Sequence, residues 1–323
     1  MKTLEKETRK SIRKEASYVG WGLTLYTIIS SGIVIFSILF AIVRLFLEHP
    51  EITEQDALYF QMMEQCEKSG TSSIIGVCVG TVFLFLFLRK KVTIPMLMQN
   101  GKKMKTVSFL QIFGIFLGAQ TFFTLFSGLL EWGFNLFGYS ALGQVESSVE
   151  ISTTVSMFLY ASVIGPIIEE IVYRGFVLRS LEKYGKLLAI VVSSILFGIM
   201  HANIPQGFFA FGVGIVLAYV TVEYSIKWAM LLHVINNCIM SDVLGWLISR
   251  LNVSMQETVN IALLVIYGVI AIILLYKKRN GIKAYISNHK INAEICLCIF
   301  TSIGIFIFSV VEIILAFSML EKI

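Results

Sequence analysis

Charge is scarce in this sequence. Only 15% of its 323 residues are Asp, Glu, Lys or Arg, whereas 56% are hydrophobic, and the mean hydropathy is +0.80. That amount of polar surface is too small to coat a water-soluble globule, so we expect an integral membrane protein. The longest polar stretch inside the chain is roughly 48–71, which is too short to form a soluble domain of its own.

Other signals are also missing. The five cysteines are scattered, without the paired spacing of a metal site or a disulfide framework, and we assign them no function. The formal net charge of +5 could suggest a nucleic-acid partner, but the Lys and Arg residues cluster beside apolar runs, as they do in cytoplasmic loops of membrane proteins. We therefore expect a lipid bilayer around the chain and no nucleic acid.

Nine apolar runs are candidates to cross the hydrocarbon core of a bilayer, which takes about 20 residues of helix. They predict an all-α, polytopic transmembrane helical bundle of about nine spans, of which the fifth is short. The first run is far longer than the apolar core of a signal peptide and lacks a small-residue cleavage site, so we expect it to be retained. The predicted spans cover 18–47, 72–88, 106–137, 152–181, 187–201, 207–224, 228–248, 258–276 and 293–318.

Basic residues predict the orientation of the bundle. Lys and Arg are concentrated in the N-terminal arm and in the stretches 89–105, 174–186 and 277–290, which nine alternating spans place on one side. The loops on the other side are mainly acidic or almost uncharged. Because loops rich in Lys and Arg stay in the cytoplasm, we expect a cytoplasmic N-terminus and a C-terminus outside.

Ionisable side chains inside predicted spans are the first functional candidates, because a central Asp, Lys or Arg costs ~2.5–3.5 kcal/mol on insertion scales. In the fourth span, Glu170 and Arg174 lie four residues apart and can form an ion pair. Glu169 points about 100° away, with Tyr173, and keeps a free carboxylate. An ion-pair staple needs Glu170 but not Glu169, so we favour a function for Glu169. Single charges towards span ends, such as Glu312, are expected to be interfacial.

The fifth and seventh predicted spans add two histidines and an amide. Phe197 lies one turn before His201 on the same face, and His201 alone is as readily a satisfied polar residue as a ligand or base. His233 and Asn237 are also one turn apart, so both can donate to a single oxygen, although such a pair can also cross-link helices. Two of the four histidines thus lie in the membrane beside an extra carboxylate, and this combination predicts a functional site.

These residues form an ordered series, which reads Glu-Glu-x-x-x-Arg at 169–174, Phe-x-x-x-His at 197–201 and His-x-x-x-Asn at 233–237. The series resembles the CPBP family, also called Abi, of CAAX proteases and bacteriocin-processing enzymes. The resemblance covers roughly residues 150–250, and every motif position in it is intact. Each motif alone is weak, but three in this order on neighbouring spans are specific.

The resemblance implies an intramembrane endopeptidase that hydrolyses a peptide bond of a membrane-embedded or membrane-associated substrate. By position in the motifs, Glu169 would activate water as the general base, and His201 would bind and orient that water. His233 and Asn237 would stabilise the developing oxyanion. The predicted supporting residues are Glu170, Arg174, Phe197 and Tyr173.

The sequence does not decide whether the site holds a metal ion. Glu169, His201 and His233 are one carboxylate and two imidazoles, a set that could hold zinc and leave a fourth position for water. Family members have been described as metalloproteases and also as glutamate-dependent enzymes that work without a metal. We favour no metal, with zinc as the alternative.

Other classes of intramembrane protease lack their signatures here. The sequence has no His-Glu-x-x-His and no Gly-x-Ser-Gly, and of its two aspartates, Asp56 and Asp242, one lies in a predicted span. Two non-peptidase functions are alternatives. A catalytically idle scaffold or bacteriocin-immunity protein would be favoured by degenerate motifs, and an ion-coupled transporter would spread its polar residues over both halves of the chain.

The predicted organisation has four parts. A cytoplasmic basic arm covers 1–17, the first three spans cover 18–150, a CPBP-like catalytic core of four spans covers 151–250, and the last two spans cover 251–323. The Ile- and Lys-rich composition suggests a bacterium, so we expect a bacterial plasma membrane, where prenylated CAAX proteins are not the expected substrate. Nothing in the sequence selects a particular substrate.

Overall fold

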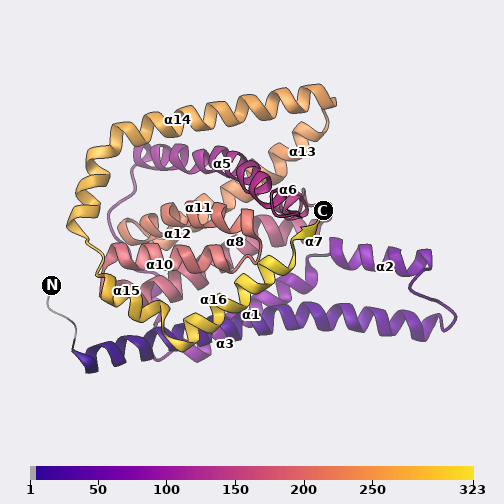
Figure 1. Cartoon of the computed structure of the whole chain (residues 1–323), viewed down its shortest axis with the longest axis horizontal. Coiled ribbons are helices and arrows are strands. Elements are labelled where there is room, and N and C mark those ends of the chain that lie inside the picture. Colours follow the sequence, from indigo (N-terminus) through magenta and orange to yellow (C-terminus); the bar gives the residue numbers. More distant parts are fainter. Residues whose placement is uncertain (1–4) are drawn as a thin grey trace.

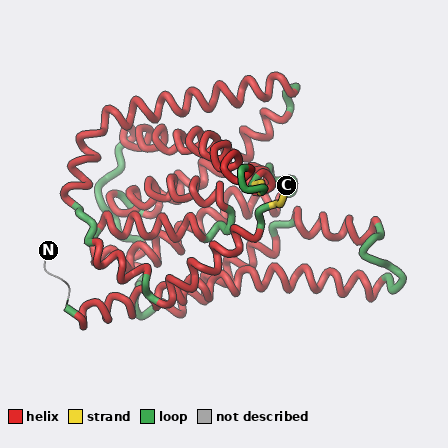
Figure 2. Tube along the Cα trace, viewed as in Figure 1, coloured by secondary structure: helices red, strands yellow, loops and turns green. Residues whose placement is uncertain are grey.

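Long apolar helices make up most of the computed structural model, which describes residues 5–323 (Figures 1 and 2). Within that range, seven helical segments are long and apolar enough to cross a bilayer, and an eighth candidate is a pair of helices with a 68° bend between them. This confirms the predicted all-α polytopic bundle. The seven are α1 (Lys6–Glu48), α3 (Thr71–Leu88), α5 (Thr106–Asn135), the run Val155–Tyr184, α11 (Ile204–Glu223), the run Ile226–Ser249 and α14 (Val253–Asn288), and the bent pair is α15 (Ala293–Phe300) with α16 (Ile303–Ser318).

The fifth predicted span is shorter than a bilayer crossing. Helix α10 (Lys186–Ile199) has 14 residues, which at 1.5 Å per residue reach only about 21 Å. Gly185, with φ +131°, precedes the helix, and the chain reverses after it through Ala202, with φ +46°. Asn203 then caps α11 by accepting a hydrogen bond from the backbone N–H of Gln206 at 3.0 Å. Among the described residues, the predicted nine full spans therefore become at most eight, with α10 as a shorter helix between them.

Two of the long runs change helix type along their length. Both contain π-helical turns, in which a backbone N–H bonds to the carbonyl five residues back, and such turns are rare and often lie at functional sites. The first run comprises α7 (Val155–Phe158), the π-helix η1 (Leu159–Ile164), α8 (Gly165–Glu169), the π-helix η2 (Glu170–Leu178), α9 (Arg179–Leu181) and the 3₁₀-helix η3 (Glu182–Tyr184). The second comprises α12 (Ile226–Val234), the π-helix η4 (Ile235–Val243) and α13 (Leu244–Ser249).

The remaining elements are short. Helix α2 follows α1 and projects from the bundle beside its far end (Figure 1). Two short strands pair antiparallel, with Tyr139 opposite Lys322 and Ser140 opposite Glu321, so the last residues lie beside the connection after α5. These elements are α2 (Ala57–Lys68), α4 (Ile94–Leu97), α6 (Leu142–Val149), β1 (Tyr139–Ser140) and β2 (Glu321–Lys322).

The four basic segments meet at one end of the bundle, where N is marked in Figure 1. Glu15 of α1 forms ion pairs with Lys91 and Lys183. Glu223, at the end of α11, is the second acidic centre, and its hydrogen bond raises the pKa of Lys102. The partners of Glu223 are Lys102 at 2.8 Å, Lys186 at 3.1 Å and the hydroxyl of Tyr285 at 3.2 Å. The segments thus gather as alternating helices require, and which end faces the cytoplasm stays a prediction.

Helices pack closely at glycines on both sides of the bundle. A Cβ added at Gly76 of α3 would lie 2.6 Å from the carbonyl oxygen of Ser30 on α1. Likewise, a Cβ at Gly118 of α5 would lie 2.2 Å from the Cβ of Ala271 on α14. A larger residue at either glycine would have to push two helices apart, so these sequences fix close helix contacts.

The deepest part of the core lies where η2 packs against α10 and α11. The largest fully buried side chains include Arg174, Tyr173, Phe176 and Phe197. A guanidinium that is fully excluded from solvent is costly unless a charge partner and hydrogen bonds compensate it. The core is therefore organised around a charged side chain, and its partners come from the segments that carry the sequence motifs.

Candidate active site

Glu170 is the centre of the buried cluster. Its side chain has no exposed surface, and its Oε1 lies 3.2 Å from Arg174 Nη1 and 3.0 Å from His233 Nδ1. The pair with Arg174 is the one that the spacing of four residues predicts. A carboxylate oxygen can only accept, so His233 Nδ1 carries the proton of that hydrogen bond. One carboxylate thus joins η2 to α12.

Arg174 is enclosed by aromatic and backbone groups. Its guanidinium carbon lies 4.0 Å from the ring centroid of Phe197, and its Nη2 donates to the carbonyl of Gly214 on α11 at 3.4 Å. A Cβ at Gly214 would lie 3.3 Å from the same Nη2, so glycine leaves room for the guanidinium. Phe197 therefore makes a cation–π contact with a guanidinium that is excluded from the surface.

Glu169 is the more accessible carboxylate of the pair. Its side chain is 22% exposed, whereas that of Glu170 is 0% exposed. Glu169 Oε2 lies 3.7 Å from His233 Nε2, just beyond hydrogen-bond distance. The His233 ring therefore stands between the two glutamates, with Nδ1 held by Glu170 and Nε2 facing Glu169. Among the described residues, Glu169 thus has a looser contact with His233 than Glu170 has.

His201 occupies the turn after α10. Its Nδ1 lies 2.8 Å from the carbonyl oxygen of Phe197, and because a carbonyl only accepts, Nδ1 carries the proton and Nε2 is left as an acceptor. The Phe197 ring meets the rings of His201 and His233 edge-on, with centroids 5.0 and 5.9 Å apart. The two histidines therefore share one aromatic support, and Glu169 lies within electrostatic range of His201.

The side chain of Asn237 is held by hydrogen bonds with Ala161 and Asn236, not with His233. Its Nδ2 donates to the carbonyl of Ala161 in η1 at 3.0 Å, and its Oδ1 accepts from Asn236 Nδ2 at 3.0 Å. Asn236 in turn accepts from Gln120 of α5 at 3.1 Å. The helical spacing put Asn237 one turn after His233, but the π-helix η4 begins between them, so their alignment differs from that of an α-helix.

Tyr173 packs into the core beside Phe197. Its ring centroid lies 5.4 Å from that of Phe197, and its hydroxyl is buried without a hydrogen-bond partner among the described residues. Tyr26 of α1 and Tyr160 of η1, which the sequence did not single out, both lie within electrostatic range of Glu169. A tyrosine carries no charge and is common near membrane interfaces, so its type alone gave no signal.

Asp242 ties η4 to η1. It is 7% exposed and accepts hydrogen bonds from the Ser152 N–H at 2.9 Å, from the Ser152 hydroxyl at 3.3 Å and from the Ser162 hydroxyl. A buried carboxylate with three donors is compensated in place. The one aspartate predicted within a span therefore connects two π-helical turns beside the cluster.

The candidate zinc ligands named from the sequence do not converge in this structure. Among residues 5–323, no group of three or more His, Cys, Asp or Glu side chains converges closely enough to hold a metal ion. The Nδ1 atoms of His201 and His233 face the Phe197 carbonyl and Glu170, which leaves Nε2 of each ring available. The candidate ligands Glu169, His201 and His233 do not form a tetrahedral zinc site as they stand.

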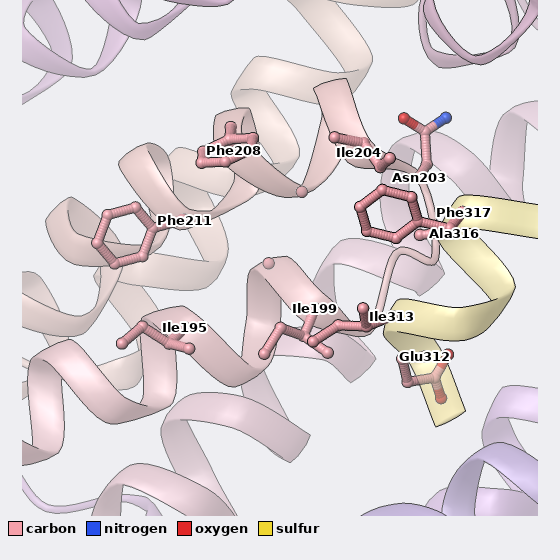
Figure 3. Close-up of a pocket in the computed structure, with 12 residues that line it drawn as sticks. Ile195, Ile199, Asn203, Ile204, Phe208, Phe211, Glu312, Ile313, Ala316 and Phe317 are labelled. Atoms are coloured by element: carbon pink, nitrogen blue, oxygen red, sulfur yellow. The ribbon is translucent and has the colours of Figure 1, made fainter. Parts of the chain in front are cut away.

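A cavity of about 440 Å³ lies between α10, α11 and α16 (Figure 3). Its walls are apolar and include Ile195, Phe211 and Phe317, with Glu312 at one edge. Glu312 is only 3% exposed, so it is buried inside the bundle, and whether it lies at the depth of the membrane interface stays a prediction. The 68° bend before α16 turns this helix, so that its Glu312 faces the inside of the bundle.

Comparison with known proteins agrees with the motifs. Residues 151–239 match the family model of Type II CAAX prenyl endopeptidase Rce1-like proteins, and this range contains all three motifs. A curated relative from Bacillus subtilis (strain 168), named "Putative membrane peptidase YdiL", is 26% identical over 165 residues. That alignment covers 49% of this chain and 65% of the relative. No solved structure matches significantly. The resemblance to the CPBP family and the assignment as an integral membrane protein are thereby confirmed.

Proposed function

We propose that this chain is an intramembrane endopeptidase of the CPBP type that hydrolyses a peptide bond in a membrane-embedded or membrane-associated substrate. The observation that carries the proposal is the difference between two adjacent carboxylates. Glu170 is fully buried and compensated by Arg174 and His233, whereas Glu169 is partly accessible and lies among groups that can handle a water molecule. The first is suited to hold the site together, and the second is suited to chemistry.

Glu169 is the general base in this proposal. It takes a proton from a water molecule whose oxygen then bonds to the scissile carbonyl carbon, and it later gives that proton to the departing amine nitrogen as the C–N bond breaks. His201 Nε2, left as an acceptor by the bond of Nδ1 to Phe197, orients the second hydrogen of the water. The water is thus held by two acceptors, one on α8 and one in the turn after α10.

Asn237 and His233 stabilise the oxyanion. Asn237 Nδ2 has two N–H groups and gives one to Ala161, which leaves the other for a substrate oxygen. His233, with Nδ1 fixed by Glu170, presents Nε2 and can donate from it when both ring nitrogens are protonated. Donors of this kind are typically worth ~2.7–4 kcal/mol each in the transition state.

The substrate class follows from the setting of the site. The motif-bearing helices pack inside a membrane bundle, so a peptide bond must enter from the bilayer or lie beside it. We propose residues 151–250 as the catalytic core, with 18–150 and 251–323 as flanking spans, and a bacterial plasma membrane as the location. A prenylated substrate is not required by any contact in the site.

Cleavage by purified protein in detergent tests the proposal, with a panel of membrane-spanning peptides as substrates. Glu169→Gln and Glu169→Ala should lose cleavage while their melting temperatures stay near that of the wild type. Glu257→Gln, an exposed glutamate on α14, is the matched control and should cleave normally. A chelator should leave the wild-type rate unaltered.

Other outcomes are informative. Normal cleavage by Glu169→Ala would contradict the proposed role of Glu169 as the general base. Chelator-sensitive cleavage that zinc restores would favour a metalloprotease over a glutamate peptidase. A wild-type protein that cleaves no peptide of a broad panel would favour a catalytically idle scaffold.

A further inference from the structure

Three side-chain amides form a chain from α5 to the motif-bearing helix. Gln120 Nε2 donates to Asn236 Oδ1 at 3.1 Å, Asn236 Nδ2 donates to Asn237 Oδ1 at 3.0 Å, and Asn237 Nδ2 donates to the Ala161 carbonyl at 3.0 Å. We call Gln120, Asn236 and Asn237 the amide relay. Asn236 is 3% exposed, so water competes little for these hydrogen bonds.

The relay has a direction. If the Asn237 amide were reversed, its oxygen would face the Ala161 carbonyl and its NH₂ would face the NH₂ of Asn236. Both contacts would be repulsive. The orientation of Asn236 is in turn selected by Gln120, which donates to its oxygen. The relay therefore decides which end of the Asn237 amide carries the donors.

The acceptor at the end of the relay is also held in place. Ala161 precedes Ser162, whose hydroxyl donates to Asp242 on the same π-helix as Asn237. The two π-helical turns η1 and η4 are thus joined at neighbouring positions. Because the Ala161 carbonyl cannot shift freely, the first N–H of Asn237 is fixed and the direction of its second N–H is fixed with it.

We propose that Gln120 and Asn236 are positioning residues that orient the Asn237 amide so that its free N–H points to the substrate oxyanion. The proposal rests on the oxyanion role of Asn237 in the proposed function. Gln120 lies in α5, outside the 151–239 match, and nothing in the three motifs assigns it a role. The relay extends the site to a helix that carries no motif.

Kinetics of Gln120→Met test the proposal. Methionine keeps the length of the side chain and removes the donor, so Asn236 and Asn237 lose their selected orientation. We expect kcat to fall about 10-fold, the size of one net hydrogen bond in a transition state, with KM unaltered. Gln111→Met is the matched control, since Gln111 is a half-buried glutamine of the same helix with no side-chain hydrogen bond among the described residues, and its kcat should not change.

A double-mutant cycle separates positioning from a purely structural role. In an Asn237→Ala background, Gln120→Met should lower kcat no further, because its effect passes through Asn237. A peptide phosphonamidate that mimics the tetrahedral anion should bind Gln120→Met more weakly by the same factor by which kcat/KM falls. Additive losses in the cycle would overturn the proposal.

The failure of this proposal is distinguishable from the failure of the proposed function. An unaltered kcat in Asn237→Ala would remove the oxyanion role and the relay with it. A reduced kcat in Asn237→Ala, together with a Gln120→Met variant that behaves as Gln111→Met, would overturn the relay alone. If Gln120→Met does not fold, Asn236→Leu breaks the same relay with a side chain of similar shape, and a kcat equal to the wild type would overturn the proposal.

Discussion

The centre of the site is a set of side chains that compensate one another. Glu170 forms an ion pair with Arg174 and a hydrogen bond with His233, and Phe197 packs against the guanidinium and both histidine rings. Taking away one partner of a buried ion pair leaves an uncompensated charge, which destabilises far more than the pair stabilises. Changes at Glu170 should therefore act on folding first, whereas changes at Glu169 should act on catalysis.

Glu170→Ala is expected to destabilise the protein by about 3–5 kcal/mol, because Arg174 would remain buried without its carboxylate. Thermal or denaturant unfolding in detergent measures the change. Glu48→Ala breaks the pair of the same spacing between Glu48 and Arg44, whose side chains are 52% and 67% exposed, and should change stability very little. Equal effects in the two variants would contradict the assignment of a buried structural pair.

At the scale of secondary structure, helical spacing predicted much of the site. The contact between Glu170 and Arg174 is present at 3.2 Å, and the aromatic ring of Phe197 lies against His201 as their spacing predicts. The π-helical turns at 170–178 and 235–243 had no signal in the pattern, because hydrophobic periodicity does not resolve one extra residue per turn. The short α10 was visible as the fifth and shortest predicted span, but its end depends on the turn at Ala202.

Ala202 holds a left-handed backbone conformation directly after His201, with φ +46°. Glycine adopts this conformation without the Cβ clash, and a β-branched residue adopts it poorly. Ala202→Gly should therefore keep or raise the melting temperature, whereas Ala202→Val should lower it and reduce cleavage by moving His201. Ala57→Val, at an exposed helical alanine of α2, controls for the added volume and should have a small effect. A fully stable and active Ala202→Val would disprove the strain.

At the scale of the whole molecule, the contacts that complete the site come from helices far away in the sequence. Gln120 lies on α5 and Tyr26 on α1, and neither carries a charge that would mark it as costly in a bilayer. Sequence could therefore predict the fold class and the residues with ionisable groups, but not which neutral side chains face them. The gathering of the basic segments around Glu15 and Glu223 was predictable, because charge marks them.

The start of α12 has a consequence for the substrate. His233 is the eighth residue from Ile226, which follows the Glu223 cluster at the basic end, so under the proposed function the reacting groups lie about 10 Å along the axis of α12 from that end. A peptide that enters from there in extended form covers about 3.3 Å per residue. Mass spectrometry of the products should then place the cut about three residues inside the membrane boundary of an extended substrate, or about seven residues inside if the segment stays helical. Cuts confined to the soluble flanks would contradict this register. The position of His233 along α12 thus predicts how far inside the membrane boundary a substrate segment is cut.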